Sequence, residues 1–174
     1  MLDITARVHP HVRISVKQVK SKPRVLSVED DHDIAKLIHF NLVNAGFSPR
    51  QVSTGEEALH SVVSDATELI ILDLALPGID GLTVCRRLKE DAQTRAIPIL
   101  IVSARSEEED VIAGLEIGAD DYITKPFSVR LLIERIRTLL RRVDLSSNER
   151  SFEESKSDTI IRNELMLDTA RHMC

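Results

Sequence analysis

Residues 68–78 of the chain read ELIILDLALPG. The apolar run over residues 69–72 shows no polar alternation, which is typical of a strand buried on both faces of a parallel sheet. The run ends on Asp73, and Pro77-Gly78 predicts a turn four residues later. Because ligands bind beyond the carboxyl ends of such strands, Asp73 is a candidate functional residue. Taken alone, an Asp in this position is more often only a turn cap.

The rest of the chain predicts four more strands, which alternate with five helices. The strands are expected over residues 24–28, 47–53, 97–102 and 122–124. The helices are expected over residues 34–46, 56–64, 82–90 and 107–117, and from 131 to near Arg142. This alternation predicts an α/β fold with a flavodoxin-like, doubly wound parallel sheet in the strand order 2-1-3-4-5.

Two segments carry sharper local predictions. The second strand is predicted to be weak, because Pro49 interrupts it. Thr54 should cap the helix that follows. The apolar residues of that helix are expected to face the core: Ala58, Leu59, Val62 and Val63.

Composition excludes several classes of protein. The chain has 174 residues, of which 43% are hydrophobic and 29% charged, and it contains no Trp. Its two cysteines, Cys85 and Cys174, lack metal-ligand spacing, which suits a reducing compartment. No apolar run has membrane-spanning length, and the N-terminus lacks the apolar centre of a signal peptide. We therefore expect a cytoplasmic protein that does not contact a membrane.

Charge divides the chain into unequal segments, although its net charge is only −5. Residues 1–22 hold five Lys or Arg and one Asp, and we interpret them as a basic leader. The globular part should be residues 23–143, which are net acidic and so unsuited to bind nucleic acid by themselves. Residues 144–158 are rich in Ser and Glu and are expected to form a linker.

Polar side chains follow four of the predicted strands, and the fold should bring them to one edge of the sheet. Three of them are the carboxylates of Glu29, Asp30 and Asp73. These would repel one another unless a cation lay between them, and Mg²⁺ prefers such oxygen ligands. Ser103 and Lys125 could bind phosphoryl oxygens beside the cation. Each residue alone would be an ordinary cap or turn residue.

This ordered set resembles the receiver domain of bacterial two-component response regulators. The resemblance covers residues 23–143 and rests on four motifs: Glu29-Asp30, Asp73, Ser103-Ala104 and Lys125-Pro126-Phe127. It implies that Asp73 accepts a phosphoryl group from a sensor histidine kinase. It also implies that Glu29, Asp30, Asp73 and the backbone carbonyl of Ala75 bind Mg²⁺.

The resemblance assigns roles to three further residues and predicts no enzymatic turnover. Lys125 should pair with the acceptor carboxylate and the phosphoryl group, and the Lys125-Pro126 peptide should be cis. Ser103 is the expected switch hydroxyl and Tyr122 the switch aromatic. Together they would alter the surface of the fourth helix, the fifth strand and the last helix. A phosphatase that uses an Asp nucleophile usually needs a second carboxylate two residues later, where this chain has Ala75.

Residues 104–110 and 118–128 are similar to the OmpR/PhoB group of transcription factors, which carry a C-terminal winged helix. Residues 159–174 resemble the first strands of that domain, but they could equally be an unstructured tail. Two functions therefore stay open: the receiver half of a DNA-binding regulator, and a stand-alone receiver that acts through a partner protein or a phosphorelay. DNA binding is expected only if a full winged helix follows.

The OmpR/PhoB resemblance also implies a two-fold dimer after phosphorylation, formed by the fourth helix, the fifth strand and the last helix. It suggests charged pairs across the interface: Glu116–Arg137, Asp121–Arg135 and Asp120–Arg142. The OmpR/PhoB group commonly has one more charged pair across this interface. At those two positions this chain has Val111 and Leu131, so an apolar contact is expected there instead. The alternative is that these charges only solvate an amphipathic surface.

Overall fold

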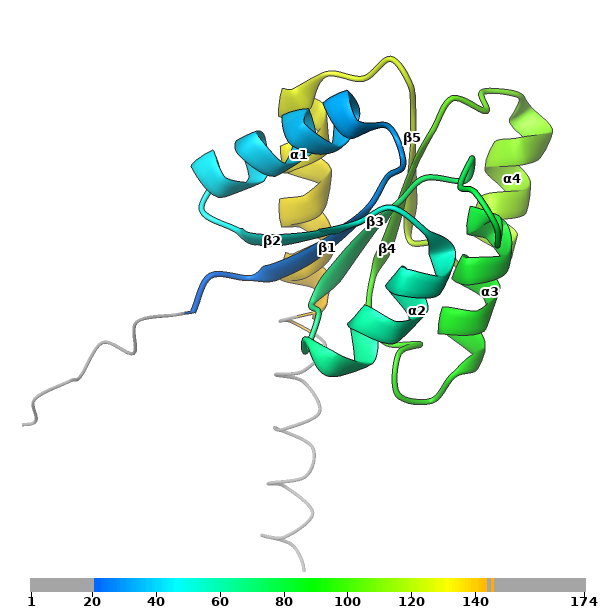
Figure 1. Ribbon diagram of the computed structural model, residues 1–174, viewed down its shortest axis with the longest axis horizontal. Coiled ribbons are helices and arrows are strands. Elements are labelled where there is room, and N and C mark those ends of the chain that lie inside the picture. The colour runs from blue at the N-terminus through cyan, green and yellow to red at the C-terminus, as the bar shows by residue number, and fades with distance from the viewer. Residues whose placement is uncertain (1–20, 144, 146–174) are drawn as a thin grey trace, which may run out of the picture.

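A computed structural model of the protein describes residues 21–143 and 145. They form a five-stranded parallel sheet in the order β2-β1-β3-β4-β5, which confirms the predicted topology (Figure 1). The strands are β1 (Arg24–Val28), β2 (Ser48–Val52), β3 (Leu69–Leu72), β4 (Ile99–Ser103) and β5 (Asp121–Thr124). The predicted tail over residues 159–174, and most of the predicted leader and linker, lie outside the described residues.

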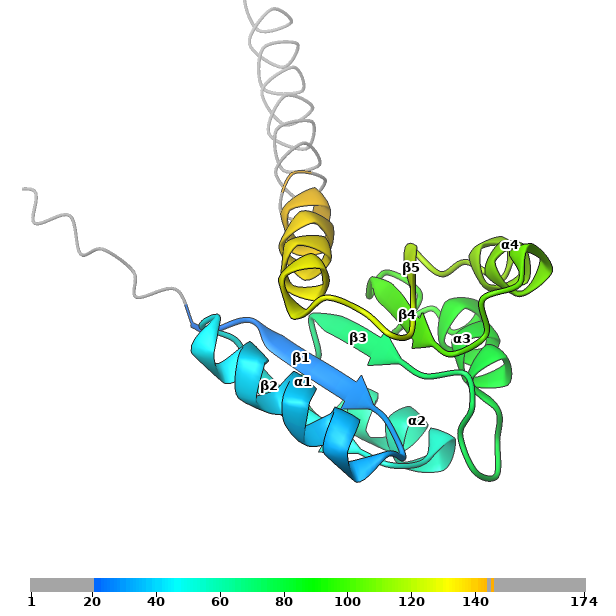
Figure 2. The ribbon, with the colours of Figure 1, turned by 90° about the horizontal axis from the view of Figure 1, so that it is seen from above.

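Helices connect the strands and cover both faces of the sheet (Figures 1 and 2). They are α1 (His32–Asn44), α2 (Gly55–Ser64), α3 (Gly81–Glu90) and α4 (Glu108–Glu116), followed by a final helix that begins at residue 129. Val143 and Leu145 are still helical, so the predicted end near Arg142 is too early. No helix in the described part of the chain combines the length and apolarity needed to cross a membrane.

The sheet separates two apolar cores, and the strand at its centre contributes to both. Successive side chains of a strand point to opposite faces. Leu69 and Ile71 of β3 accordingly pack with α1 and the final helix, whereas Ile70 and Leu72 pack with α2 and α3. All four side chains are buried, which is why this strand reads as an uninterrupted apolar run.

The structure corrects one local prediction for β2 and one for α2. Pro49 lies within a continuous β2, paired with Val25 of β1, so the predicted interruption of this strand is wrong. β2 is an edge strand, where Pro49 can be accommodated. Thr54 caps α2 by accepting a hydrogen bond from the Glu57 N–H at 3.2 Å. Ala58 and Val62 face the core, but Val63 is 60% exposed and its predicted burial is wrong. One residue after Val62 the helix has turned by about 100°, so Val63 points to solvent.

Candidate functional site

The candidate site lies at the carboxyl edge of the sheet, which we call the functional edge. It is built from residues that directly follow three of the strands: Glu29 after β1, Asp73 after β3 and Lys125 after β5. The sheet's hydrogen-bond ladder continues one step beyond the strands, because the Asp73 N–H donates to the Val28 carbonyl at 3.0 Å. In the same way the Lys125 N–H donates to the Ser103 carbonyl at 2.7 Å. The backbones that carry these side chains are therefore held by the rigid sheet.

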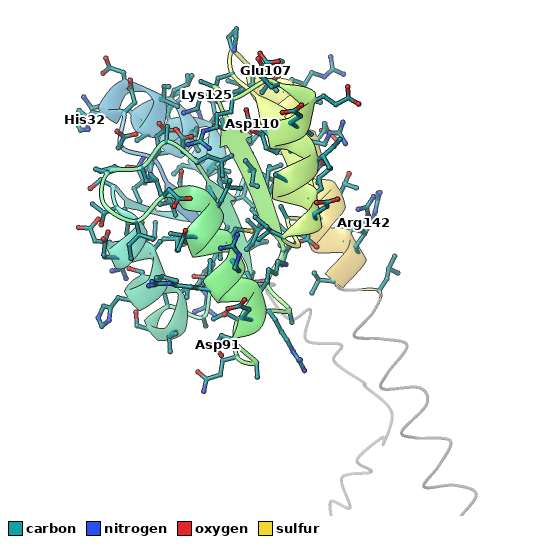
Figure 3. All side chains as sticks on the ribbon, turned by 90° about the vertical axis from the view of Figure 1, so that its right-hand side faces the viewer. His32, Asp91, Glu107, Asp110, Lys125 and Arg142 are labelled. Carbon is teal, nitrogen blue, oxygen red and sulfur yellow. The ribbon has the colours of Figure 1, made fainter. Side chains whose placement is uncertain are left out.

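Lys125 forms the centre of a charged network at this edge. Its Nζ lies 2.7 Å from Asp73 Oδ2, and 2.9 and 2.7 Å from the two carboxylate oxygens of Glu29. The exposed fractions of the three side chains are only 12% for Lys125, 5% for Asp73 and 3% for Glu29. Figure 3 labels Lys125 near one end of the molecule, and Asp91, just after α3, near the opposite end.

Burial and charge shift the proton affinities of this network. Burial raises the pKa of Glu29 above its ordinary value of 4.5, although the hydrogen bonds and charge of Lys125 offset part of that change. Burial alone would lower the pKa of Lys125, but its contacts with Asp73 and Glu29 more than compensate and raise it above 10.5. Lys125 is therefore a stable ammonium at neutral pH.

Glu29, Asp30 and Asp73 form an acidic triad at this edge of the sheet. One carboxylate oxygen from each lies within 4.8 Å of the others. Glu29 and Asp73 are buried while Asp30 is exposed, so the triad is open to solvent on one side. Among the described residues, Lys125 is the one ammonium in contact with this triad, and it contacts only Glu29 and Asp73. The remaining surplus of negative charge and hard oxygen donors fits a divalent cation. The predicted role of the Ala75 carbonyl stays a prediction.

Ser103 and Tyr122 meet at the loop that follows β4. Ser103 is fully buried, and its Oγ accepts a hydrogen bond from the Arg105 N–H at 3.3 Å. The Tyr122 hydroxyl donates to the Arg105 carbonyl at 2.8 Å, and its ring packs against Gly114 of α4. Burial raises the pKa of Tyr122. Sequence reasoning missed Arg105, because its backbone makes these contacts and backbone groups give no signal in a sequence.

Several charges assigned to a dimer interface already have partners within one copy. Asp121 pairs with Arg135 at 3.1 Å. Arg137 pairs with Glu134 at 2.9 Å within the final helix. Asp120 lies 2.8 Å from Lys89 and also accepts the Ile99 N–H at 2.8 Å. The predicted intermolecular pairs would therefore compete with contacts inside the domain.

A hollow of about 280 Å³ lies beside β5 on this same surface. Its lining includes Val111, Tyr122, Phe127, Leu131 and Arg135. Leu131 is 44% exposed, so an apolar side chain is available next to the hollow. The site edge and this surface share the segment from Tyr122 to Phe127.

A doubly wound sheet that gathers an acidic triad and a partly buried lysine at its carboxyl edge defines the receiver class of signalling domain. Residues 25–137 match the response regulator receiver domain family, and the chain belongs to this family. It is therefore a regulatory phospho-acceptor domain of two-component signalling rather than an enzyme, and it implies a partner histidine kinase.

Individual relatives agree with this assignment. The chain is 44% identical over 122 residues to the DNA-binding dual master transcriptional regulator RpaA of Synechocystis. This match covers 70% of this chain and 51% of RpaA. It is 39% identical over 140 residues to the alkaline phosphatase synthesis transcriptional regulatory protein PhoP of Bacillus subtilis, covering 79% of this chain and 58% of PhoP. The chain thus spans about half the length of the curated relatives it matches.

Solved structures show the same architecture. The receiver domain of the Francisella response regulator 1452 has a TM-score of 0.66 at 35% identity and covers 70% of this chain and 98% of that one. The BeF₃-activated receiver domain of Klebsiella pneumoniae RstA has a TM-score of 0.64 at 32% identity, covering 68% of this chain and 98% of that one.

Proposed function

We propose that Asp73 accepts a phosphoryl group from the phosphohistidine of a sensor kinase in a reaction that requires Mg²⁺. The observation that carries this proposal is the 2.7 Å contact between Asp73 Oδ2 and Lys125 Nζ within the acidic triad. A carboxylate oxygen of Asp73 attacks phosphorus, the phosphorus–nitrogen bond of the donor breaks, and the imidazole leaves. Lys125 compensates the charge that develops on the phosphoryl oxygens.

Glu29, Asp30, Asp73 and the Ala75 carbonyl would hold the cation. When bound, Mg²⁺ neutralises the phosphoryl group and the carboxylates during transfer. The Ala75 N–H donates to Asp73 Oδ1 at 3.1 Å, and Lys125 contacts Oδ2. Both oxygens of the acceptor are thereby oriented before a donor arrives.

Intact-mass measurement after treatment with acetyl phosphate and Mg²⁺ tests the acceptor. The wild-type chain should gain one phosphoryl group, and Asp73→Asn should gain none. Asp80→Asn is the matched control, because Asp80 lies on the same loop and caps α3, and Asn preserves a cap. Equal labelling of Asp73→Asn and the wild type would refute Asp73 as the acceptor. Labelling of the wild type without divalent cation would refute the Mg²⁺ requirement.

We further propose that phosphorylation acts on the surface formed by α4, β5 and the final helix. A phosphoryl group on Asp73 would attract the Ser103 hydroxyl away from the Arg105 N–H. Tyr122 contacts the same residue through the Arg105 carbonyl, so the loop and the ring would move together. The two arrangements form a two-state equilibrium that phosphorylation shifts.

The expected consequence is a phosphorylation-dependent homodimer through this surface. Arg135 and Asp121 would exchange their partner within the chain for the equivalent residue of the second copy. Because exchange of ion pairs contributes little net free energy, the apolar contact of Val111 and Leu131 would carry more of the association.

Light scattering of the beryllofluoride-treated chain tests this interface. Arg135→Glu should keep the treated chain monomeric at concentrations where the wild type dimerises. Lys36→Glu makes the same change of charge at an exposed position of α1 and should dimerise normally. A treated wild type that stays monomeric at high micromolar concentration would contradict the dimer, and a dimer insensitive to Arg135→Glu would contradict this surface.

Control of transcription is the proposed output, supported by the names of RpaA, PhoP and the phosphate regulon regulatory protein PhoB. The genomic reading frame beyond Cys174 should encode the rest of a winged-helix domain. The full-length product should bind promoter DNA more tightly after phosphorylation. A stop codon directly after Cys174 would favour the stand-alone receiver instead.

A further inference from the structure

We propose that Glu56, in the first turn of α2, is a positioning residue for the metal site. It holds the loop that follows Asp73, and through that loop it places the Ala75 carbonyl for Mg²⁺. This inference rests on the proposed function, because it concerns the proposed backbone ligand. Glu56 itself does not belong to the acidic triad and contacts none of its three carboxylates in the hydrogen bonds of the described residues.

The carboxylate of Glu56 contacts two consecutive residues of the loop from a different element of the fold. Its Oε1 accepts a hydrogen bond from the Ile79 N–H at 3.3 Å. A Cβ atom on Gly78 would lie 2.8 Å from Oε1 and 3.2 Å from Oε2, so the carboxylate packs directly against the Gly78 backbone. Gly78 has a φ of +76°, a conformation that favours glycine, and it forms the turn at this point.

The two ends of the loop are fixed independently of Glu56. At its start, the Asp73 N–H belongs to the sheet ladder and the Leu74 side chain is buried. At its end, the Gly81 N–H donates to the Leu74 carbonyl at 3.1 Å, and a Cβ on Gly81 would lie only 2.1 Å from the Asp73 carbonyl oxygen. The first turn of α3 therefore packs against the backbone of Asp73 itself.

The middle of the loop has fewer restraints. The Ala75 N–H contacts Asp73 Oδ1, and the Leu76 side chain is buried. Within the described part of the chain, the bond from Ile79 to Glu56 is the one hydrogen bond that joins residues 75–80 to an element other than the loop's own strand and helix. Glu56 thus restrains the segment whose carbonyl is needed for the cation.

Glu56 is presented from a rigid base. Thr54 caps α2 by accepting the Glu57 N–H, and Glu57 Oε2 accepts the N–H of Ser53, the residue before the cap, at 2.9 Å. Gly55 lets α2 approach the loop closely, since a Cβ there would lie 2.8 Å from the Ile79 carbonyl oxygen. The backbone of Glu56 is therefore fixed, and its exposed carboxylate is positioned by its contacts with Gly78 and Ile79.

Calorimetric titration of the unphosphorylated chain with Mg²⁺ tests the proposal. Glu56→Ala should weaken Mg²⁺ binding about tenfold, the lower end of the effect that loss of an outer-shell partner has. Glu56→Gln keeps an acceptor oxygen without the charge and should stay within about twofold of the wild type. Glu68→Ala is the matched control, because Glu68 also accepts a backbone N–H, that of Arg24 at 3.0 Å, at the other end of the sheet.

Amide hydrogen exchange of Ile79 in Mg²⁺-free buffer supplies a second readout. It should accelerate in Glu56→Ala and not in Glu68→Ala, while the melting temperature shows that both variants are folded. Equal loss of Mg²⁺ affinity in Glu56→Gln and Glu56→Ala would overturn the proposal in favour of a charge effect. Unchanged Mg²⁺ affinity in Glu56→Ala would also overturn it. A wild type that binds no Mg²⁺ would instead refute the proposed metal site itself.

Discussion

Two partly buried lysines lie at opposite ends of this sheet, and they have different surroundings. Lys125, at the carboxyl edge, has a side chain that is 12% exposed, and Lys89, near the start of β4 and β5, one that is 15% exposed. Lys89 contacts Asp120 and the carbonyls of Ile97 and Arg95 at 2.8, 3.0 and 3.4 Å. Each lysine therefore joins segments that are distant in the sequence.

The difference between them is the balance of charge. Lys89 meets one carboxylate, and that carboxylate also accepts the Ile99 N–H, so the cluster is neutral and its donors have partners. Lys125 meets Asp73 and Glu29, with Asp30 close by, so the cluster keeps a surplus of negative charge. A balanced polar cluster stabilises a fold, whereas a surplus in an open cluster indicates a binding site.

The largest effect should follow from removing the lysine of the unbalanced cluster. Lys125→Ala should slow phosphorylation by acetyl phosphate about a hundredfold, because a preorganised donor to the phosphoryl oxygens is lost, while some labelling remains. Lys89→Ala should change the rate by less than about twofold under conditions where it is folded, since Lys89 contacts Ile97 and Asp120 at the other end of the sheet. Rapid-quench labelling measures both. Equal rates in the two variants would remove the functional distinction between the lysines.

For stability, the Lys89 cluster should matter more than its small effect on the phosphorylation rate suggests. Asp120→Ala leaves Lys89 and the Ile99 N–H without their carboxylate, and should lower the free energy of unfolding by about 2 kcal/mol in urea denaturation. The adjacent Asp121→Ala removes only a surface pair with Arg135, whose side chain is 50% exposed, and should cost about 0.5 kcal/mol or less. A loss in Asp121→Ala as large as in Asp120→Ala would contradict the structural role assigned to the Lys89 cluster.

A surplus of negative charge can be relieved, so one substitution at the functional edge should stabilise the protein. Asp30→Asn should raise the free energy of unfolding by about 0.5–1 kcal/mol in Mg²⁺-free buffer, because it reduces repulsion among the triad. Asp33→Asn removes a charge that suits the first turn of α1 and should be neutral or slightly destabilising. Saturating Mg²⁺ should raise the free energy of unfolding of the wild type more than it raises that of the Asp30→Asn variant. Destabilisation by Asp30→Asn without Mg²⁺ would show that the cluster is balanced after all.

The smallest effects concern pH. The pKa of Glu29 is raised above 4.5 in the folded state, so its contribution to stability is present below pH 4.5 and is lost as the pH rises through the folded pKa. Without Mg²⁺, the free energy of unfolding of the wild type relative to Glu29→Gln should therefore fall as the pH increases above 4.5. A constant difference would contradict the raised pKa.

Asp80 provides the opposite sign at a helix cap. Hydrogen bonds from the Thr83 hydroxyl and N–H lower its pKa below 3.8, so its contribution is present above pH 3.8 and is lost as the pH falls through the folded pKa. The wild type relative to Asp80→Asn should accordingly lose stability below pH 3.8. The same denaturation series measures both slopes.

The sequence could predict the functional edge because each strand there ends on a distinctive residue type. An apolar run that stops at Asp73 or before Lys125 can be recognised locally, and the topology then brings the ends together. The Lys89 cluster has no such signal, since its partners are backbone carbonyls and a carboxylate that is distant in sequence. From the sequence, Asp120 is therefore predicted only as a residue of the dimer interface and not as the partner of Lys89. Val63 shows the same limit on a smaller scale, because apolar character alone does not determine which face of a helix is buried.

The placement of Pro49 also affects how the protein behaves at high concentration. The Ser48 N–H donates to the Pro23 carbonyl at 2.9 Å, toward β1, and neighbouring backbone nitrogens along a strand point in opposite directions. The nitrogen of Pro49 therefore faces outward, and because proline has no N–H it cannot donate a hydrogen bond to an added strand. A second molecule cannot complete a hydrogen-bond ladder along this border of the sheet. Pro49 thus protects a strongly apolar sheet against edge-to-edge aggregation without weakening its own pairing with β1.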